Sequence, residues 1–320
     1  MTIGIGIIGT GSISDDAHAP AIKAVDGARL AAVLSRDALA GDAFLRRHGA
    51  SEGRTHTDIA AFAADADIDI VLIASPDRLH GDQAVACLNA GKHVLVEKPM
   101  ATSIADARRM ADAAIAGRKG LKVGFHLRSH AGHLALKHRL HEIGSLRHIR
   151  GIWAFPQKDA SGWRAGPALA RWWSLAAVGA HVIDLARWFS DDFDEWAAFS
   201  SVISRDVWQG PHDETAVIAA KLKSGATVEL VSSVQFGPYA RFELFGDRGD
   251  AICEGTLGRK GAGDVRLNGE NLSFEAAPPF VRQLREFVAA VKGDRALNET
   301  EINAGIRNTR DLLRAIECKE

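Results

Sequence analysis

The stretch Ile3-Gly4-Ile5-Gly6-Ile7-Ile8-Gly9-Thr10-Gly11-Ser12-Ile13-Ser14 decides the fold of this chain. Its isoleucines form an apolar run typical of a buried strand, and a helical stretch from Ala17 to Val25 follows the glycines. A glycine turn between a strand and a helix lets backbone N–H groups and the positive end of the helix dipole face a pyrophosphate. The stretch therefore predicts a dinucleotide-binding unit at the start of the chain.

Two registers of this glycine pattern are possible. Gly4 to Gly9 also fits G-x-G-x-x-G, but those residues belong inside the strand. We place the cofactor turn at Gly9, Gly11, Ser12 and Ile13, and the third glycine or alanine of the pattern is replaced by Ser14, which is small enough for close helix packing. The alternative is an ordinary strand-to-helix turn.

The first 120 residues alternate short apolar runs with alanine-rich helical stretches, which is typical of βαβ units around a parallel sheet. The expected strands are Ile3–Ile8, Leu30–Leu34, Ile68–Ala74, His93–Val96 and Leu121–Phe125. The expected helices between them include Asp37 to Arg47, Gly81 to Ala90 and Ser103 to Ala116. Residues 1–120 are therefore predicted to form a Rossmann dinucleotide-binding domain, so the fold class is α/β.

Beyond residue 145 this alternation stops, and β-rich segments follow one another. The expected strands are Arg147–Phe155, Trp196–Ile203, Thr215–Leu222, Thr227–Val234, Ala240–Phe245 and Asp250–Glu254, with helices from Trp172 to Phe189 and from Val281 to Val291. Residues 121–320 are predicted to form an α+β substrate-binding and oligomerisation domain with a large, mostly antiparallel open sheet. A sheet with one bare face commonly packs against a partner, so we expect a homodimer or homotetramer.

The composition is that of an ordinary globular protein of two domains. Thirty-nine basic against 40 acidic residues give a formal net charge of -1, which offers no electrostatic case for nucleic acid or an anionic membrane. Cys87, Cys253 and Cys318 are scattered, without the spacing of a disulfide framework or a zinc site. With neither a leader pattern nor a membrane-length apolar run, the sequence predicts a cytoplasmic protein with a small-molecule partner.

The tip of the second strand reads Ser35-Arg36-Asp37, where dinucleotide folds select their cofactor. Ser35 can donate a hydrogen bond, and Arg36 can hold a 2′-phosphate and stack on adenine, so the pair favours NADP over NAD. Asp37 is interpreted as the N-cap of the next helix, and the alternative is a ribose-binding carboxylate that would favour NAD.

Two further strands carry polar residues to the same carboxyl edge of the sheet. Ser75-Pro76-Asp77-Arg78-Leu79-His80 follows one of them, and Glu97-Lys98-Pro99 follows the next. Ligands bind at this edge in open α/β folds, so we expect Ser75, His80, Glu97 and Lys98 to contribute to the cofactor site. A proline after Lys98 restricts the chain where a lysine must be held.

Together these motifs resemble the glucose-fructose oxidoreductase and inositol dehydrogenase family, often called Gfo/Idh/MocA. The resemblance rests on the N-terminal glycine turn, Ser75-Pro76 to His80, Ala90-Gly91-Lys92-His93-Val94-Leu95-Val96-Glu97-Lys98-Pro99 and Gly179-Ala180-His181-Val182-Ile183-Asp184. It covers nearly the whole chain, and the Glu-Lys-Pro stretch is its most specific part.

The resemblance implies that Lys98 is catalytic beside the nicotinamide, that its bond to Pro99 is cis, and that His181 is the acid/base histidine. Histidine suits this work because its pKa lies near neutrality. The family usually has an aspartate four residues before that histidine, where this chain has Ala177. Asp184, three residues after His181, is either a partial substitute or a structural residue, and we count it among the residues that bind substrate.

Four more residues resemble sugar-facing positions in reductases for anhydro-ketosugars. His126 and Arg128 follow the sixth strand, and Trp163 and Arg164 lie before the helix that contains Trp172. Trp163 offers a stacking face and Arg164 a fork for hydroxyl groups, and the alternatives are a core tryptophan and a surface ion pair.

Six histidines gather between residues 126 and 148, and three of them have the spacing of one helix face. They are His126, His130, His133, His138, His141 and His148. Zinc is one interpretation, but no cysteine or carboxylate completes the set. We expect no metal, and we expect most of these side chains on the exposed face of a helix from His130 to Ile143.

The sequence thus predicts an NADP-dependent oxidoreductase, with NAD possible, that transfers hydride to or from a carbon of a sugar, polyol or keto-sugar. Two alternatives remain: a dinucleotide-binding sensor that has lost turnover, as Ala177 suggests, and a glycoside hydrolase that uses bound NAD transiently.

Overall fold

A computed structural model describes residues 2–157, 162–166, 168–203, 213–293 and 299–317. The chain divides into two compact units. The first comprises Met1–Gly124 and Phe280–Thr309, and the second comprises Phe125–Pro279 and Arg310–Glu320. Neither unit is continuous in sequence, whereas the sequence had suggested a single division near residue 120.

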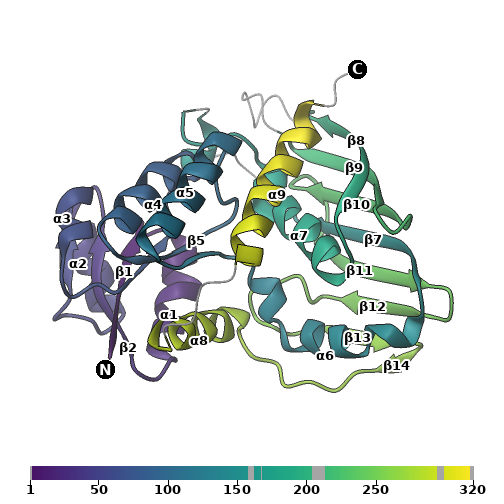
Figure 1. The fold of residues 1–320 in the computed structure, drawn as a ribbon, viewed down its shortest axis with the longest axis horizontal. Helices are drawn as coiled ribbons and strands as arrows, with labels where there is room; N and C mark the ends of the chain where they lie inside the picture. Colours follow the sequence, from purple (N-terminus) through teal and green to yellow (C-terminus); the bar gives the residue numbers. More distant parts are fainter. Residues whose placement is uncertain (1, 158–161, 167, 204–212, 294–298, 318–320) are drawn as a thin grey trace. The chain divides into compact units, whose positions relative to one another are not determined.

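The first unit is built on a parallel sheet of six strands in the order β3-β2-β1-β4-β5-β6 (Figure 1). The strands are β1 (Ile3–Ile8), β2 (Ala28–Leu34), β3 (Arg54–His56), β4 (Ile70–Ile73), β5 (His93–Val96) and β6 (Leu121–Val123). β1 and β4 are adjacent although two strands separate them in sequence, so the strand order reverses between them. This doubly wound order confirms the predicted Rossmann sheet and places its ligand-binding crevice at the carboxyl end of β1.

Helices cover this sheet, and several begin at the caps that the sequence predicts. They are α1 (Ala19–Lys23), α2 (Ala38–Arg47), α3 (Ile59–Ala64), α4 (His80–Asn89), α5 (Ile104–Gly117), α8 (Pro279–Lys292) and the first part of α9 (Glu299–Glu317). Asp37 and Ser103 accept hydrogen bonds from the first turns of α2 and α5 as N-caps. α8 contributes Phe280, Leu284 and Phe287 to the same core as β1.

The second unit holds an eight-stranded sheet in the order β14-β13-β12-β11-β7-β10-β9-β8 (Figure 1). The strands are β7 (Leu146–Ala154), β8 (Phe193–Ser201), β9 (Thr215–Leu222), β10 (Thr227–Ser233), β11 (Tyr239–Gly246), β12 (Asp250–Glu254), β13 (Asp264–Leu267) and β14 (Glu270–Asn271). Only the β7–β10 pair among them is parallel. The predicted large, mostly antiparallel sheet is confirmed.

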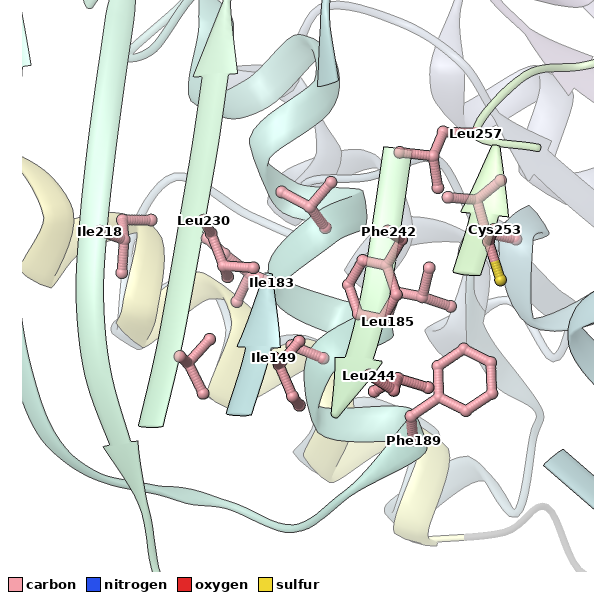
Figure 2. Packing of buried hydrophobic residues seen from close by; sticks show 14 of the residues in the cluster. Ile149, Ile183, Leu185, Phe189, Ile218, Leu230, Phe242, Leu244, Cys253 and Leu257 are labelled. Carbon is pink, nitrogen blue, oxygen red and sulfur yellow. The ribbon is translucent and has the colours of Figure 1, made fainter. Parts of the chain in front are cut away.

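One face of this sheet packs on helix α7 (Ala180–Phe189). Ile183, Leu185 and Phe189 of α7 lie among buried strand residues such as Leu230 and Phe242 (Figure 2). The other face bears side chains of the opposite alternation, among them the exposed Phe199 and its cross-strand neighbour Val217. The alternation in β9, with Ala216 and Ile218 buried and Val217 exposed, therefore leaves one face of the sheet uncovered within this unit.

Within the described ranges, no helix combines the length and the apolar character that crossing a bilayer would require.

Candidate functional site

The glycine turn after β1 has the geometry that a phosphate requires. Gly9 has φ +91°, and a Cβ there would lie 2.9 Å from the carbonyl oxygen of Ala74. A Cβ at Gly11 would meet no heavy atom within 4 Å, so the space beside it is open to a ligand. Gly4, by contrast, lies inside β1, where a Cβ would be 1.8 Å from the carbonyl oxygen of Asp67. The register that starts at Gly9 is therefore correct.

The helix that follows begins at Ser12 and contains a π-helical turn, Ser14–His18 (η1), before α1. Ser14 occupies the third position of the pattern and donates its hydroxyl to the carbonyl oxygen of Gly9 over 2.6 Å, which fastens the helix to the turn. Gly11 and Ser12 are exposed, and Ile13 is half-buried. The open end of this helix fits the pyrophosphate of a dinucleotide.

At the tip of β2, Arg36 is exposed and Ser35 is half-buried. The Asp37 carboxylate accepts hydrogen bonds from the backbone N–H groups of Leu39, at 2.9 Å, and Ala40, at 3.4 Å. The N-cap interpretation of Asp37 is confirmed. Ser35 Oγ accepts from the backbone N–H of Asp37, which orders the tip further.

Ser75 and His80 lie at the carboxyl end of β4. Ser75 Oγ donates to Gln83 Oε1 over 2.5 Å. His80 is fully buried, and its ring nitrogens lie 2.9 Å from the carbonyl oxygen of Pro99 and 3.0 Å from that of Ser75. The imidazole thus ties the loop after β4 to the loop after β5.

The Glu97-Lys98-Pro99 loop leaves β5 at the same edge, and the Lys98-Pro99 peptide is cis, as the resemblance implied. Glu97 is buried, and each of its carboxylate oxygens accepts a hydrogen bond. His18 Nε2 donates to Oε1 over 2.8 Å, and the backbone N–H of Lys98 donates to Oε2 over 3.1 Å. His18 was not predicted from the sequence.

Other residues of the motif around Lys98 hold the fold together. Lys92 Nζ donates to the carbonyl oxygens of Asp65 and Ile68, at 2.7 and 2.8 Å. His93 Nδ1 accepts from the backbone N–H of Gly120 over 2.9 Å. This part of the motif therefore fixes β5 beside β4 and β6.

In the second unit, His181 and His126 come together, although 55 residues separate them in sequence. Their rings meet edge to face with centroids 4.5 Å apart, and both side chains are buried. His181 lies in the first turn of α7, and His126 lies in the short 3-10 helix His126–Ser129 (η3). The half-buried Trp153 of β7, which the sequence analysis missed, lies 5.5 Å from the His181 ring centroid.

Arg128 and Asp184 form a two-pronged ion pair in the same region. Arg128 Nε donates to Asp184 Oδ2 over 2.8 Å, and Nη2 donates to Oδ1 over 2.5 Å. Asp184 is 2 % exposed, so its charge depends on this guanidinium. The pair joins η3 to α7 and thereby ties the segment that carries His126 to the helix that carries His181.

Ala177 lies in a second π-helical turn, Leu175–Gly179 (η6), directly before α7. It packs on the small apolar cluster of Trp173 and Val234, so this position offers an apolar contact where relatives have a carboxylate. Trp163 and Arg164 lie together in the 3-10 helix Gly162–Ala165, with the guanidinium carbon 4.1 Å from the indole centroid.

The expectation that most of the clustered histidines lie on an exposed helix face is wrong for three of the six. His126, His130 and His133 are buried, and the helix itself ends earlier, as α6 (Ala131–Arg139). His133 donates from Nδ1 to the carbonyl oxygen of Leu127, and its Nε2 accepts from the hydroxyl of Thr256. Burial lowers the pKa of His133 to about 3, so it is a neutral core residue. Among the described residues, no three His, Cys, Asp or Glu side chains are arranged to hold a metal ion.

Comparisons with known proteins agree with this geometry. A family model described as "Oxidoreductase family, NAD-binding Rossmann fold" matches residues 3–125. A second model, described as "GFO/IDH/MocA C-terminal domain", matches residues 134–252. Together the two models cover both sheets.

Individual relatives are similar over most of their length. The chain is 32 % identical to inositol 2-dehydrogenase 2 of Saccharopolyspora erythraea, over 83 % of this chain and 80 % of the relative. It is 28 % identical to 1,5-anhydro-D-fructose reductase of Ensifer adhaerens, over 90 % and 88 %. The crystal structure of aldose-aldose oxidoreductase from Caulobacter crescentus, complexed with glycerol, shares the fold with a TM-score of 0.89 and 24 % identity, over 99 % and 98 % of the two chains.

Proposed function

This chain belongs to the Gfo/Idh/MocA family of oxidoreductases, and we propose that it transfers hydride between NADP and a carbinol or carbonyl carbon of a sugar or polyol. Relatives named for inositol and for an anhydro-keto-sugar support this substrate class. The alternation of half-buried aromatic and charged side chains around His181 suits a polyhydroxylated ligand.

The observation that carries the proposal is the meeting of three strand ends in the first unit. β1, β4 and β5 are neighbours, and the open glycine turn, Ser75 and Lys98 follow their carboxyl ends. This edge is the ligand crevice of a doubly wound sheet. The chain therefore presents a lysine beside a dinucleotide cradle.

The roles of the chain's own residues follow from their chemistry. The dinucleotide, when bound at the glycine turn, supplies or accepts the hydride. We assign Lys98 to polarising the oxygen on the reacting carbon, because an ammonium stabilises charge that develops there. We assign His181 to taking the proton of that oxygen during oxidation and returning it during reduction.

The second unit supplies the proposed substrate contacts. His126 and Trp153 enclose the His181 ring, and Arg128 with Asp184 fixes the segments that carry both histidines. We propose that Trp163 stacks on a sugar ring and that Arg164 donates to its hydroxyl groups.

Cofactor choice and assembly complete the proposal. Because capping occupies Asp37, the exposed Arg36 is free to meet a 2′-phosphate, which favours NADP over NAD. We further propose a cytoplasmic homodimer or homotetramer, paired through the bare face of the eight-stranded sheet. The buried thiols of Cys87 and Cys253 suit a reducing compartment.

The deciding experiment combines binding with turnover. Titration of the purified protein with NADPH and with NADH, followed by calorimetry, gives both affinities, and a panel of inositols, aldoses and keto-sugars is then assayed for change in nicotinamide absorbance. We expect tighter NADPH binding, turnover with at least one polyol or keto-sugar, and loss of turnover with retained dinucleotide binding in Lys98→Ala and His181→Ala.

Other outcomes identify the alternatives. Dinucleotide binding without turnover across the panel would support a sensor, for which Ala177 is the motivating residue. Tightly retained NAD with glycoside cleavage and no net reduction would support a hydrolase. Absence of any dinucleotide binding would refute the oxidoreductase proposal.

A further inference from the structure

The buried contact between His18 and Glu97 joins two parts of the first unit that are 79 residues apart in sequence. Both side chains lie in the interior, with 3 % and 9 % of their side-chain surfaces exposed. A buried imidazole–carboxylate pair adds little stability over apolar residues of the same volume, because its desolvation cost offsets its attraction. What such a pair does supply is direction.

That direction acts on Lys98. The Glu97 carboxylate has two oxygens, and the one that His18 leaves free accepts the backbone N–H of Lys98. Rotation of the carboxylate would break both bonds, so His18 determines where that N–H is held. The backbone of Gly124 restricts Glu97 from another side, since a Cβ there would lie 3.2 Å from Oε1.

A second imidazole holds the other side of the lysine. His80 contacts the carbonyl oxygen of Pro99, the residue directly after Lys98. The Lys98 residue thus lies between two anchored backbone groups, its own N–H and the carbonyl of Pro99. Its side chain therefore starts from a fixed backbone.

The helix that follows the glycine turn is built to place His18. His18 ends the π-helical turn η1, which has a wider hydrogen-bond ring than an α-helix and so rotates the side chains that follow it. Ser14, the first residue of η1, is bonded to Gly9. The edge of the Phe280 ring from α8 packs on the His18 imidazole, with centroids 5.2 Å apart.

We propose that His18, acting through Glu97, is a positioning residue for Lys98. The proposal rests on the catalytic role of Lys98 stated above. A reacting group must be held closely, and loss of a residue that orients it typically costs 10- to 100-fold in activity.

The test compares two substitutions at His18. His18→Leu keeps the volume and removes the donor, whereas His18→Gln places an amide nitrogen near the position of Nε2. We expect His18→Leu to lower kcat roughly 10-fold or more, with Kd for the dinucleotide within about twofold of the unaltered protein, and His18→Gln to recover most of kcat.

The matched control is His56→Leu. His56 Nε2 donates to the buried Asp65 carboxylate over 2.9 Å, so this variant also removes an imidazole–carboxylate bond from the first unit. It has no part in the proposed machinery, and we expect kcat within about twofold of the unaltered protein whatever its loss of stability.

A readout without turnover keeps the proposal separate from the proposed function. Trace acetylation with acetic anhydride across a pH series, with mass spectrometry, measures the reactivity of the Lys98 amine in every variant. We expect it to rise about threefold or more in His18→Leu, because a loosened loop exposes the amine more often, and to stay unchanged in His56→Leu.

This measurement is informative even if the unaltered protein turns over none of the substrates offered. Equal Lys98 reactivity in the unaltered protein and His18→Leu would overturn the proposal. So would a kcat for His18→Gln that is no higher than that of His18→Leu.

Discussion

Arg36 and Asp37 are adjacent, but only one of them is available to a ligand. Asp37 caps α2, whereas the Arg36 guanidinium lies at the exposed tip of β2. Cofactor choice at this tip therefore depends on a single side chain.

We predict that Arg36→Glu weakens NADPH binding by about 10- to 100-fold, because a charge-assisted hydrogen bond contributes roughly 1.5–3 kcal/mol. NADH lacks the 2′-phosphate, so its Kd should change little. Isothermal titration with both nucleotides measures the two effects. Arg46→Glu, an exposed charge reversal on α2, is the control, and an unchanged NADPH:NADH ratio in Arg36→Glu would refute the assignment.

The Arg128–Asp184 pair gives a prediction about stability. Asp184→Asn leaves the guanidinium without its anion, and we expect a loss of about 3 kcal/mol in the free energy of unfolding. Replacing both residues, with Arg128→Met and Asp184→Leu, should cost less than the single change.

Tryptophan fluorescence during urea unfolding measures this loss selectively. All seven tryptophans lie in the Phe125–Pro279 part of the second unit, so their emission follows that unit. If Asp184→Asn unfolded at the same urea concentration as the unaltered protein, the pair would be only a surface contact.

The candidate site was partly predictable from single residues. Gly9, Gly11 and Lys98 follow apolar strands, so their place at one sheet edge can be derived from the sequence. His18 could not be derived in this way, because its partner Glu97 is distant in sequence and the π-helical turn that aims it has no sequence signature. Trp153 lies on a strand where a tryptophan is equally typical of a core.

At the scale of elements, the start of the helical segment before His181 depends on Asp213. Its carboxylate accepts from the backbone N–H groups of Trp173 and Leu175 and from the Ser174 hydroxyl. Burial raises the pKa of Asp213 to about 6 from an ordinary value of 3.8, which means that the folded state binds the proton more tightly than the unfolded state.

We predict that this carboxyl stabilises the fold at acidic pH. Its contribution is complete below the unfolded pKa and is lost as the pH rises through the folded pKa. Relative to Asp213→Asn, the free energy of unfolding should fall by about 2 kcal/mol between about pH 4.5 and about pH 7. Urea midpoints for both proteins across this range test the slope, and parallel curves would refute it.

Elements with a strong apolar period were predicted closely, and β5, β9 and β12 have the expected bounds. β3 (Arg54–His56) was missed because its three residues are polar and lie at the sheet edge. The β13 and β14 strands were missed for a similar reason, since they are short and rich in charged residues. α9 was missed because its apolar residues are dispersed among many charged ones.

For the whole molecule, the division of the chain matters more than the count of elements. The first unit needs α8, which returns to it after the entire second sheet. No single cut of the sequence isolates either unit.

We predict that residues 1–124 alone do not fold cooperatively. They lack Phe280, Leu284, Phe287 and Val288, and burial of four such side chains contributes roughly 6–12 kcal/mol, as much as a whole domain retains. Joining 280–309 to residue 124 through a glycine–serine linker should restore a cooperative melt by circular dichroism and dinucleotide binding.

The same linked protein with Phe280→Asp and Phe287→Asp is the control and should remain unfolded. A cooperative melt of residues 1–124 by themselves would show that α8 is dispensable.

The late return of α8 also sets an order of events on the ribosome. When Gly124 leaves the exit tunnel, the nascent parallel sheet still lacks the helix whose phenylalanines complete its core. At ordinary elongation rates, roughly ten to thirty seconds pass before α8 emerges. During that interval the second sheet is synthesised, while an apolar surface of the first remains open to chaperones. The half of the chain that is translated first is therefore the half that finishes folding last.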